Sequence, residues 1–253
     1  MAPHLSQRRL VLGSHSPRRL ELMGLLGLDF EASAPDIDEE TEEKRLFGSP
    51  PAAVAIAVAM EKARAIIRGH PDATVVSADT MVVLAGRSLG KPKDGRDALA
   101  MLSDLAGKPH DVVTGVVVGH DETWRSTAVT TRVTMRDAPR DELEAYVRSE
   151  EPLDKAGAYG IQGQGGSLVE AVEGCYLNVV GFPLCAVSAL LTQTGALDIG
   201  DPAAFCAAAA ETFSVEGDKQ KQGRSFLGSH PLMSQSAEAL THRRTLLRRT
   251  VHP

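Results

Sequence analysis

The sequence has no apolar run long enough to span a membrane, and it has few cysteines. The apolar stretch after the basic N-terminus stops at Gly13 and Ser14, which is too short for the core of a signal peptide. Cys175, Cys185 and Cys206 are an odd number at spacings that match no zinc or disulfide framework. We therefore expect free thiols in a reducing compartment, the cytoplasm, and no membrane contact.

The sequence also lacks an excess of positive charge. Lys and Arg number 27 against 33 Asp and Glu, so the formal net charge is −6. Proteins that coat nucleic acids usually present a basic surface to the phosphates, so we expect no nucleic-acid partner. Local basic clusters can still bind a small anion. With 43% hydrophobic residues in 253, the chain is long enough to bury the core of one large domain, with or without an appendage.

The character of the sequence changes near residue 200. Before it, short β-rich runs alternate with helical patterns, which favours a mixed α/β fold with a central sheet. These patterns lie at 9–14, 52–67, 73–86, 95–107, 110–120, 123–136 and 140–149, and a buried helix that Gly195 ends follows 178–184. The segment 200–253 is rich in Gly, Ser, Gln and Lys in its middle and buries too little apolar area to order itself. We expect a domain at 8–199 and a poorly ordered extension at 200–253.

An anion site is predicted where the strand at 9–14 leads into a leucine-rich helix. Pro17 suits the first helical position and Ser16 the N-cap, so exposed backbone N–H groups follow them. Arg18 and Arg19 add guanidinium groups that match phosphate oxygens. The alternative is an ordinary capped helix with solvated arginines. A P-loop is excluded, because the sequence has no G-x-x-x-x-G-K-[ST].

A carboxylate interrupts a second apolar stretch. Asp79 and Thr80 lie inside 75–84, which otherwise reads as one buried strand, and a buried carboxylate is costly unless it is paired or binds a cation. The alternative is that Asp79 ends one strand and caps a turn. Lys91 follows on a loop next to Pro92, either as a phosphate ligand or as a surface lysine.

A third stretch, 151–184, is rich in glycine and contains Gln162 between Ile161 and Gly163. Glycine lets a backbone approach a ligand closely, and an amide can both donate to and accept from the edge of a planar base. The stretch predicts a binding loop, although a simple turn has the same composition.

These stretches together resemble the Maf family of nucleoside triphosphate pyrophosphatases over roughly residues 8–195. Any one of the motifs can arise by chance, but they follow in the order of the family. They are "LGSHSPRRLELM" (12–23), "DIDEE" (36–40), "MEKARAI" (60–66), "SADTMVV" (77–83), "LGKPKD" (89–94), "LAGKPHDVVTG" (105–115), "DKAGAYGIQG" (154–163) and "NVVGFPL" (178–184).

The resemblance implies an activity and a fold. The activity is hydrolysis of a nucleoside triphosphate to the monophosphate and pyrophosphate, with a divalent metal such as Mg²⁺ or Mn²⁺. Its cellular role would be to remove unwanted nucleotides before they enter nucleic acid. The fold is a two-lobed, mixed-sheet α/β structure of the Maf and ITPase type, with the active site in the cleft between the lobes, often as a homodimer.

The resemblance also assigns residues. Asp79 matches the catalytic proton acceptor, which suits a carboxylate that deprotonates water beside a metal. Basic or hydroxyl positions expected to hold phosphates are matched by Ser14, Arg19, Lys62 and Lys91. Glu39 matches an acidic position that could help to carry the metal, whose ligands stay open. His110 falls in a family motif, and we expect it to support the structure around the site.

Three further positions separate family members that hydrolyse dTTP and UTP from those that prefer 7-methyl-GTP. Here they are Arg18, Thr80 and Gln162, which resembles the dTTP/UTP group. Amide and guanidinium donors suit the edge of a neutral pyrimidine, whereas a cationic methylated purine favours an aromatic face and carboxylates. Two alternatives stay open: a 7-methyl-GTP pyrophosphatase, and a nucleotide-binding regulator of septum formation in cell division with little turnover.

Overall fold

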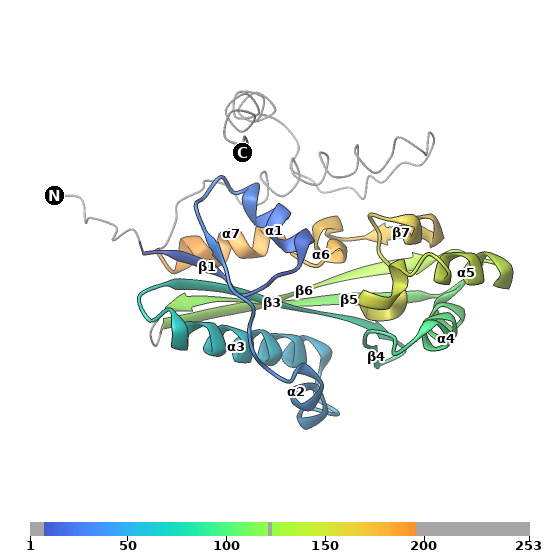
Figure 1. The fold of residues 1–253 in the computed structure, drawn as a ribbon, viewed down its shortest axis with the longest axis horizontal. Coiled ribbons are helices and arrows are strands. Elements are labelled where there is room, and N and C mark those ends of the chain that lie inside the picture. Colours follow the sequence, from blue (N-terminus) through green and yellow to red (C-terminus); the bar gives the residue numbers. More distant parts are fainter. Residues whose placement is uncertain (1–7, 121–122, 196–253) are drawn as a thin grey trace.

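A computed structural model describes residues 8–120 and 123–195 (Figure 1). The predicted extension at 200–253, with Cys206, lies outside the described residues, as do 196–199 at the end of the predicted domain.

The described chain alternates strands and helices, as expected. The strands are β1 (Leu10–Leu12), β2 (Glu31–Ala32), β3 (Thr74–Leu84), β4 (Arg87–Leu89), β5 (Pro109–His120), β6 (Thr123–Met135) and β7 (Val169–Glu173). The α-helices are α1 (Pro17–Gly24), α2 (Glu39–Arg45), α3 (Pro51–Gly69), α4 (Gly95–Leu105), α5 (Arg140–Val147), α6 (Tyr176–Val180) and α7 (Leu184–Gln193). Three short 3₁₀ helices are η1 (Glu151–Asp154), η2 (Ala156–Ala158) and η3 (Gln164–Leu168).

One mixed sheet organises the described residues. Its strand order is β2-β1-β3-β5-β6-β7, and β4 pairs with β3 beyond the end of β1. The β2–β1 and β1–β3 pairs are parallel, and the other pairs are antiparallel. The predicted mixed α/β fold with a central sheet is confirmed.

Helices cover both faces of the sheet where β1 and β3 lie side by side. Helix α3 packs on one face, against Val75 and Val117, while α1, α6 and α7 pack on the other, against Val76 and Val116 (Figure 1). Residues of opposite parity along β3 therefore enter different cores, as the period of a strand requires. This part of the molecule is the first lobe.

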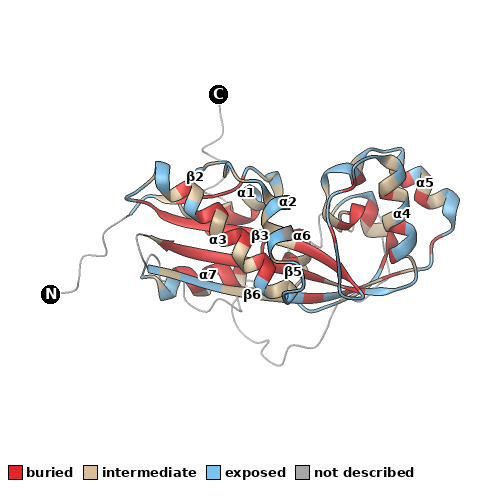
Figure 2. Ribbon diagram, turned by 90° about the horizontal axis from the view of Figure 1, so that it is seen from below, coloured by how far each residue is buried: buried red, intermediate tan, exposed pale blue. Residues whose placement is uncertain are grey.

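The far ends of β3, β5 and β6 carry a second lobe. Its core joins the ends of these strands to α4 and α5, with Val82, Leu102, Val112, Met135 and Leu143 among its buried residues. Figure 2 shows the two masses, with the long buried strands running between them. The predicted two-lobed arrangement is therefore present.

Two details at element boundaries agree with the sequence. Pro17 begins α1 with Ser16 at the N-cap, and α7 ends at Gln193, two residues before Gly195. The alternative in which Asp79 ends a strand is wrong, because β3 continues through Asp79 to Leu84. This strand pairs with β5 from Val75 to Val83, which keeps the carboxylate within the sheet. Within the described residues, no helix has both the length and the apolar character needed to cross a membrane.

Candidate active site

A cleft of about 700 Å³ lies between the two lobes. The loop before α1 and the start of that helix line it from the first lobe, residues 151–163 line it from the second, and the middle of β3 forms its floor. All of the residues that the sequence predicted for the site line this cleft. They are Ser14, Arg18, Arg19, Glu39, Lys62, Asp79, Thr80, Lys91 and Gln162.

Lys62 enters the site from the apolar stripe of α3. The buried residues of α3 recur at helical spacing, and Lys62 occupies one of these positions with Ala59 and Ile66 on either side. Gly115 of β5 sets the depth of this packing, because a Cβ there would lie 2.4 Å from the backbone of Ala55. The helix thus lies against the sheet, and the lysine ammonium reaches β3.

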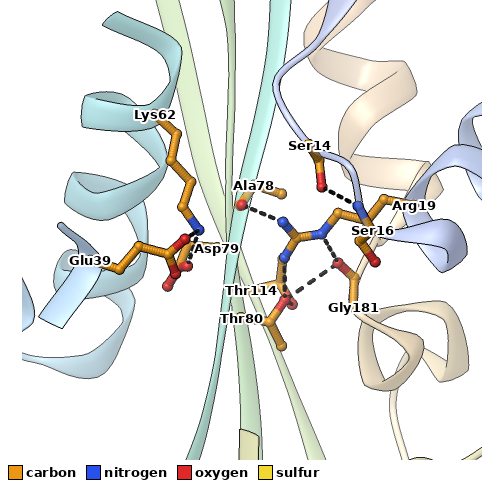
Figure 3. Close-up of polar contacts among 10 residues, drawn as sticks. All are labelled: Ser14, Ser16, Arg19, Glu39, Lys62, Ala78, Asp79, Thr80, Thr114 and Gly181. Carbon is orange, nitrogen blue, oxygen red and sulfur yellow. Dashed lines mark hydrogen bonds and ion pairs between the residues drawn. The ribbon is translucent and has the colours of Figure 1, made fainter. Parts of the chain in front are cut away.

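Asp79, Lys62 and Glu39 form one charged cluster on this face of β3 (Figure 3). The Lys62 Nζ lies 2.7 Å from Asp79 Oδ1 and 3.0 Å from Glu39 Oε1. Asp79 and Lys62 are only 4% and 5% exposed, so this pair is screened far less than a surface pair. One ammonium thus faces two carboxylates, and the cluster carries a net negative charge that attracts a cation.

Asp79 keeps one oxygen for further chemistry. Its Oδ2 is buried and has no hydrogen-bond partner among the described residues, whereas most buried polar side-chain atoms have at least one. Among the described residues, His, Cys, Asp and Glu side chains form no group of three that could hold a metal ion. A metal at this site would therefore depend on Asp79 and Glu39, with its other ligands coming from water and substrate.

The floor of the cleft is an open edge of β3. On this edge β1 pairs with Thr74–Val76 and β4 pairs with Val82–Leu84, which leaves the backbone from 77 to 81 facing the cleft. Arg19 reaches this edge: its Nη1 donates to the carbonyl of Ala78 at 2.7 Å, and its Nε donates to the carbonyl of Gly181 at 3.0 Å (Figure 3).

Thr80 lies on the opposite face of β3 from Asp79, beside Arg19. The Arg19 Nη2 donates to Thr80 Oγ1 at 3.0 Å, and the same oxygen lies 3.0 Å from Thr114 Oγ1 and donates to the carbonyl of Gly181 at 3.3 Å. A hydroxyl has one donor and two acceptor sites. Protein partners therefore occupy the Thr80 hydroxyl, and its methyl group is what remains for a ligand.

The contacts of Arg19 bear on its predicted role. Three of the five N–H groups of a guanidinium are used on Ala78, Gly181 and Thr80, so phosphate binding would depend on the other two. Burial lowers the pKa of Arg19, and the nearby carboxylates of Asp79 and Glu39 oppose this shift. An arginine remains charged in either case.

Two serines lie next to the start of α1, where this helix lines the cleft. Ser14 is buried, and its Oγ accepts a hydrogen bond from the backbone N–H of Ser16 at 3.2 Å. The Ser16 side chain makes no capping bond, so the first N–H groups of this eight-residue helix do not receive the usual N-cap acceptor. Arg18 is half-buried and Lys91 is exposed, and both line the cleft.

The second lobe brings residues that the sequence did not single out. Glu151, Asp154, Lys155 and Tyr159 line the same cleft as Gln162. In the sequence these residues were visible only as part of the segment "EPLDKAGAYGIQG". Its composition drew attention to the glycines of this segment and not to its charged residues. His110 is confirmed as a supporting residue: it is buried, and its Nε2 lies 2.7 Å from the hydroxyl of Tyr159.

His110 is expected to make stability depend on pH. Burial lowers its pKa from 6.5 to about 4, so the stabilisation is complete above pH 6.5 and is lost as the pH falls toward 4, where the unfolded chain binds the proton first. The loss is on the order of 3 kcal/mol. The free energy of unfolding, measured with urea between pH 7 and 4, should depend less steeply on pH in His110→Asn than in the wild type. The control His15→Asn, at an exposed position, should keep the wild-type slope.

The sequence model of the family described as Maf-like protein matches residues 9–194. The chain belongs to the Maf family. Maf relatives with a curated name are similar over nearly their whole length, since the chain covers more than nine tenths of each. The matched region includes every residue that lines the cleft.

Three such relatives are each named dTTP/UTP pyrophosphatase. The protein of Moorella thermoacetica is 49% identical over 74% of this chain and 95% of its own, and that of Myxococcus xanthus is 48% identical over 75% and 94%. The protein of Dictyoglomus turgidum is 41% identical over 75% and 97%. Among solved structures, the Staphylococcus aureus Ham1 protein is 13% identical and gives a TM-score of 0.41 over 84% of this chain and 100% of that one.

Proposed function

We propose that this Maf protein hydrolyses dTTP and UTP to the monophosphate and pyrophosphate. The observation that carries the proposal is the convergence of Asp79, its counter-ion Lys62 and the basic and amide residues of both lobes on one cleft. The relatives named dTTP/UTP pyrophosphatase support the same activity. The substrate is therefore a nucleotide. By hydrolysing it, the protein would remove unwanted nucleotides before they enter nucleic acid.

Asp79 acts as the base for the attacking water. Lys62 holds the Oδ1 atom, which leaves the buried Oδ2 as the atom that accepts the proton. A carboxylate in this position orients the water and removes its proton as the water oxygen bonds to the α-phosphorus. The bond from the α-phosphorus to the oxygen that bridges to the β-phosphate then breaks, and pyrophosphate leaves. Lys62 holds the carboxylate in place between α3 and β3.

A divalent cation, Mg²⁺ or Mn²⁺, fits the residues present. Asp79 and Glu39 would hold it, because Mg²⁺ typically takes one or two protein carboxylates together with waters and substrate phosphates. The Asp79 carboxylate and the half-buried Glu39 carboxylate are groups of this kind. When bound, the cation neutralises charge on the phosphate oxygens.

The triphosphate lies between positive groups of both lobes. Arg19 and Ser14 approach it from the start of α1, and Lys91 from the loop after β4. The N-terminus of α1 adds backbone N–H groups and the positive end of the helix dipole. Lys62 is held between two carboxylates, so its main task is to balance them and only secondarily to meet phosphate.

Base choice depends on Arg18, Thr80 and Gln162. The expected result for Arg18→Trp is a change of preference: the ratio of kcat/KM for dTTP to that for 7-methyl-GTP should fall by about tenfold or more, because a guanidinium donor is replaced by an aromatic face that suits a cationic purine. Steady-state rates on both nucleotides measure the ratio. An equal loss on every nucleotide would instead place Arg18 on the phosphates.

Product analysis tests the proposed reaction. Incubation of dTTP with the wild-type protein and Mg²⁺, followed by anion-exchange separation, should yield dTMP and pyrophosphate in equal amounts. Release of dTDP and phosphate would contradict the proposal. The same assay with Mn²⁺ and with EDTA tests the requirement for a cation, and activity that survives EDTA would overturn the metal part alone.

Neither alternative gains support from an observation on this chain. The three relatives described above are named dTTP/UTP pyrophosphatase, and a regulator with little turnover has no need for the Asp79–Lys62 pair. We further propose a cytoplasmic location, which the few cysteines favour, and a homodimer, which the family resemblance implies. Size-exclusion chromatography with light scattering tests the second point.

A further inference from the structure

Glu151 lies at the wall of the cleft and bonds to three separate donors. It begins η1, directly after the segment that follows α5. Its Oε1 accepts from the hydroxyl of Tyr146 at 3.0 Å, and the backbone N–H groups of Gln164 and Gly165 donate to Oε2 at 2.9 Å and to Oε1 at 3.3 Å. The carboxylate thus caps the first turn of η3.

The same network holds both ends of the loop that carries Gln162. The backbone N–H of Gly160 donates to the Tyr146 hydroxyl at 3.3 Å, on one side of Gln162, while Glu151 binds residues 164 and 165 on the other. The carboxylate also lies tightly against the loop: a Cβ on Gly163 would be 2.3 Å from Glu151 Oε1. Gln162 is therefore held between two anchors that share one hydrogen bond.

We propose that Glu151 is a positioning residue for base choice: its carboxylate holds the 160–165 loop so that the amide of Gln162 meets a pyrimidine in one orientation. This inference rests on the proposed function. Glu151 is not itself a ligand of the triphosphate, because most of the acceptor capacity of its carboxylate is used within the protein, and its charge has the same sign as that of the substrate.

The chemistry of the bases explains why position matters. Uracil and thymine present an N–H donor beside a carbonyl acceptor, and a Gln amide complements this pair with its oxygen and its NH₂ group. Cytosine presents the reverse pattern, which the same amide satisfies once it is turned over. An amide held in one orientation can distinguish uracil and thymine from cytosine, whereas an amide on a mobile loop can turn over and accept either pattern.

Tyr146 belongs to the same hydrogen-bond network but lies outside the cleft, so it allows a second test of the network. It is buried on α5 and is absent from the lining of the cleft. Burial and the charge of Glu151 raise the pKa of its hydroxyl, so the hydroxyl stays protonated and donates to the carboxylate. Loss of this hydroxyl should loosen the same loop without any change in the cleft wall.

The test compares Glu151→Gln, Tyr146→Phe, Gln162→Ala and the double variant Glu151→Gln/Gln162→Ala on dTTP, UTP and CTP. Glu150→Gln is the matched control, since Glu150 is the adjacent, exposed carboxylate. We expect Glu151→Gln to raise KM for dTTP and UTP by about tenfold or more, the effect of a lost hydrogen bond to a charged group, with kcat nearly unchanged. The preference for dTTP over CTP should fall by a similar factor in Glu151→Gln, Tyr146→Phe and Gln162→Ala. In the double variant this preference should fall no further than in Gln162→Ala alone.

Two results would overturn the inference: an equal loss of kcat on all three nucleotides, or full additivity in the double variant. If Glu151→Gln does not fold, Tyr146→Phe decides by the same criterion. If the wild type releases no pyrophosphate from any nucleotide, the proposed function fails by itself. Calorimetric binding of the α,β-imido analogues of dTTP and CTP then decides the inference: a wild-type preference for the dTTP analogue that Tyr146→Phe abolishes supports it, and no wild-type preference contradicts it.

Discussion

The Asp79→Asn variant is expected to release pyrophosphate from dTTP about 10²–10⁴ times more slowly than the wild type, the usual contribution of a general base. Asparagine has the same shape and can still accept a hydrogen bond from Lys62 at the position of Oδ1. It cannot accept the proton of the attacking water. KM for dTTP should therefore change far less than kcat, and steady-state kinetics with Mg²⁺ separates the two.

Asp104→Asn is the matched control for this variant. Asp104 is a carboxylate on α4 that pairs with Arg87 at 3.0 Å at the surface, away from the cleft. It should keep full activity. Turnover by Asp79→Asn within a few-fold of the wild type would show that another group accepts the proton.

The Lys62→Met variant is expected to lose about 3–5 kcal/mol of unfolding free energy, as when one partner of a buried ion pair is removed. Methionine fills the same space in the stripe of α3, but it leaves the carboxylates of Asp79 and Glu39 without their shared cation. Urea unfolding measures the loss. The double variant Lys62→Met/Asp79→Asn should recover most of it, because the buried charge is then removed as well.

Arg64→Met serves as the control on the same helix. Arg64 pairs with Glu61 at 2.7 Å, but both side chains are solvated, and such pairs contribute about 0–1 kcal/mol. A loss in Lys62→Met no larger than that in Arg64→Met would contradict the assignment of Lys62 as the counter-ion of the site.

The sequence predicted most of the fold because its elements carry local signals. The apolar run of β3, the Ser-Pro start of α1 and the buried pattern of α7 are each visible over a few residues. The open edge of β3 between β1 and β4 was not predictable in this way, since it depends on where two distant strands stop pairing. Likewise, Gly115 reads as an ordinary strand residue until α3 is placed against it.

The sequence predicted which residues line the cleft better than it predicted the contacts among them. Burial cost alone marked Asp79 for a partner, but the spacing of 17 residues to Lys62 has no local meaning. The family resemblance assigned Lys62 to the phosphates and did not predict its pairing with Asp79. Arg19 was predicted to hold phosphate, and its bonds to Ala78 and Gly181 join segments that lie 59 and 162 residues away in the chain. Glu151 was missed because two of its three donors are backbone N–H groups, which residue types do not reveal, and because only the fold brings the third, the Tyr146 hydroxyl, to it.

Initial rates of pyrophosphate release from dTTP, UTP, CTP and 7-methyl-GTP by the wild-type protein, with Mg²⁺, test the central claim most directly. Arg18, Thr80 and Gln162 on the walls and floor of the cleft predict that dTTP and UTP have the highest kcat/KM and that 7-methyl-GTP is turned over poorly. If 7-methyl-GTP is the best substrate, the assignment of these three residues to a pyrimidine is wrong. If no nucleotide yields pyrophosphate, the cleft does not perform the reaction proposed for it.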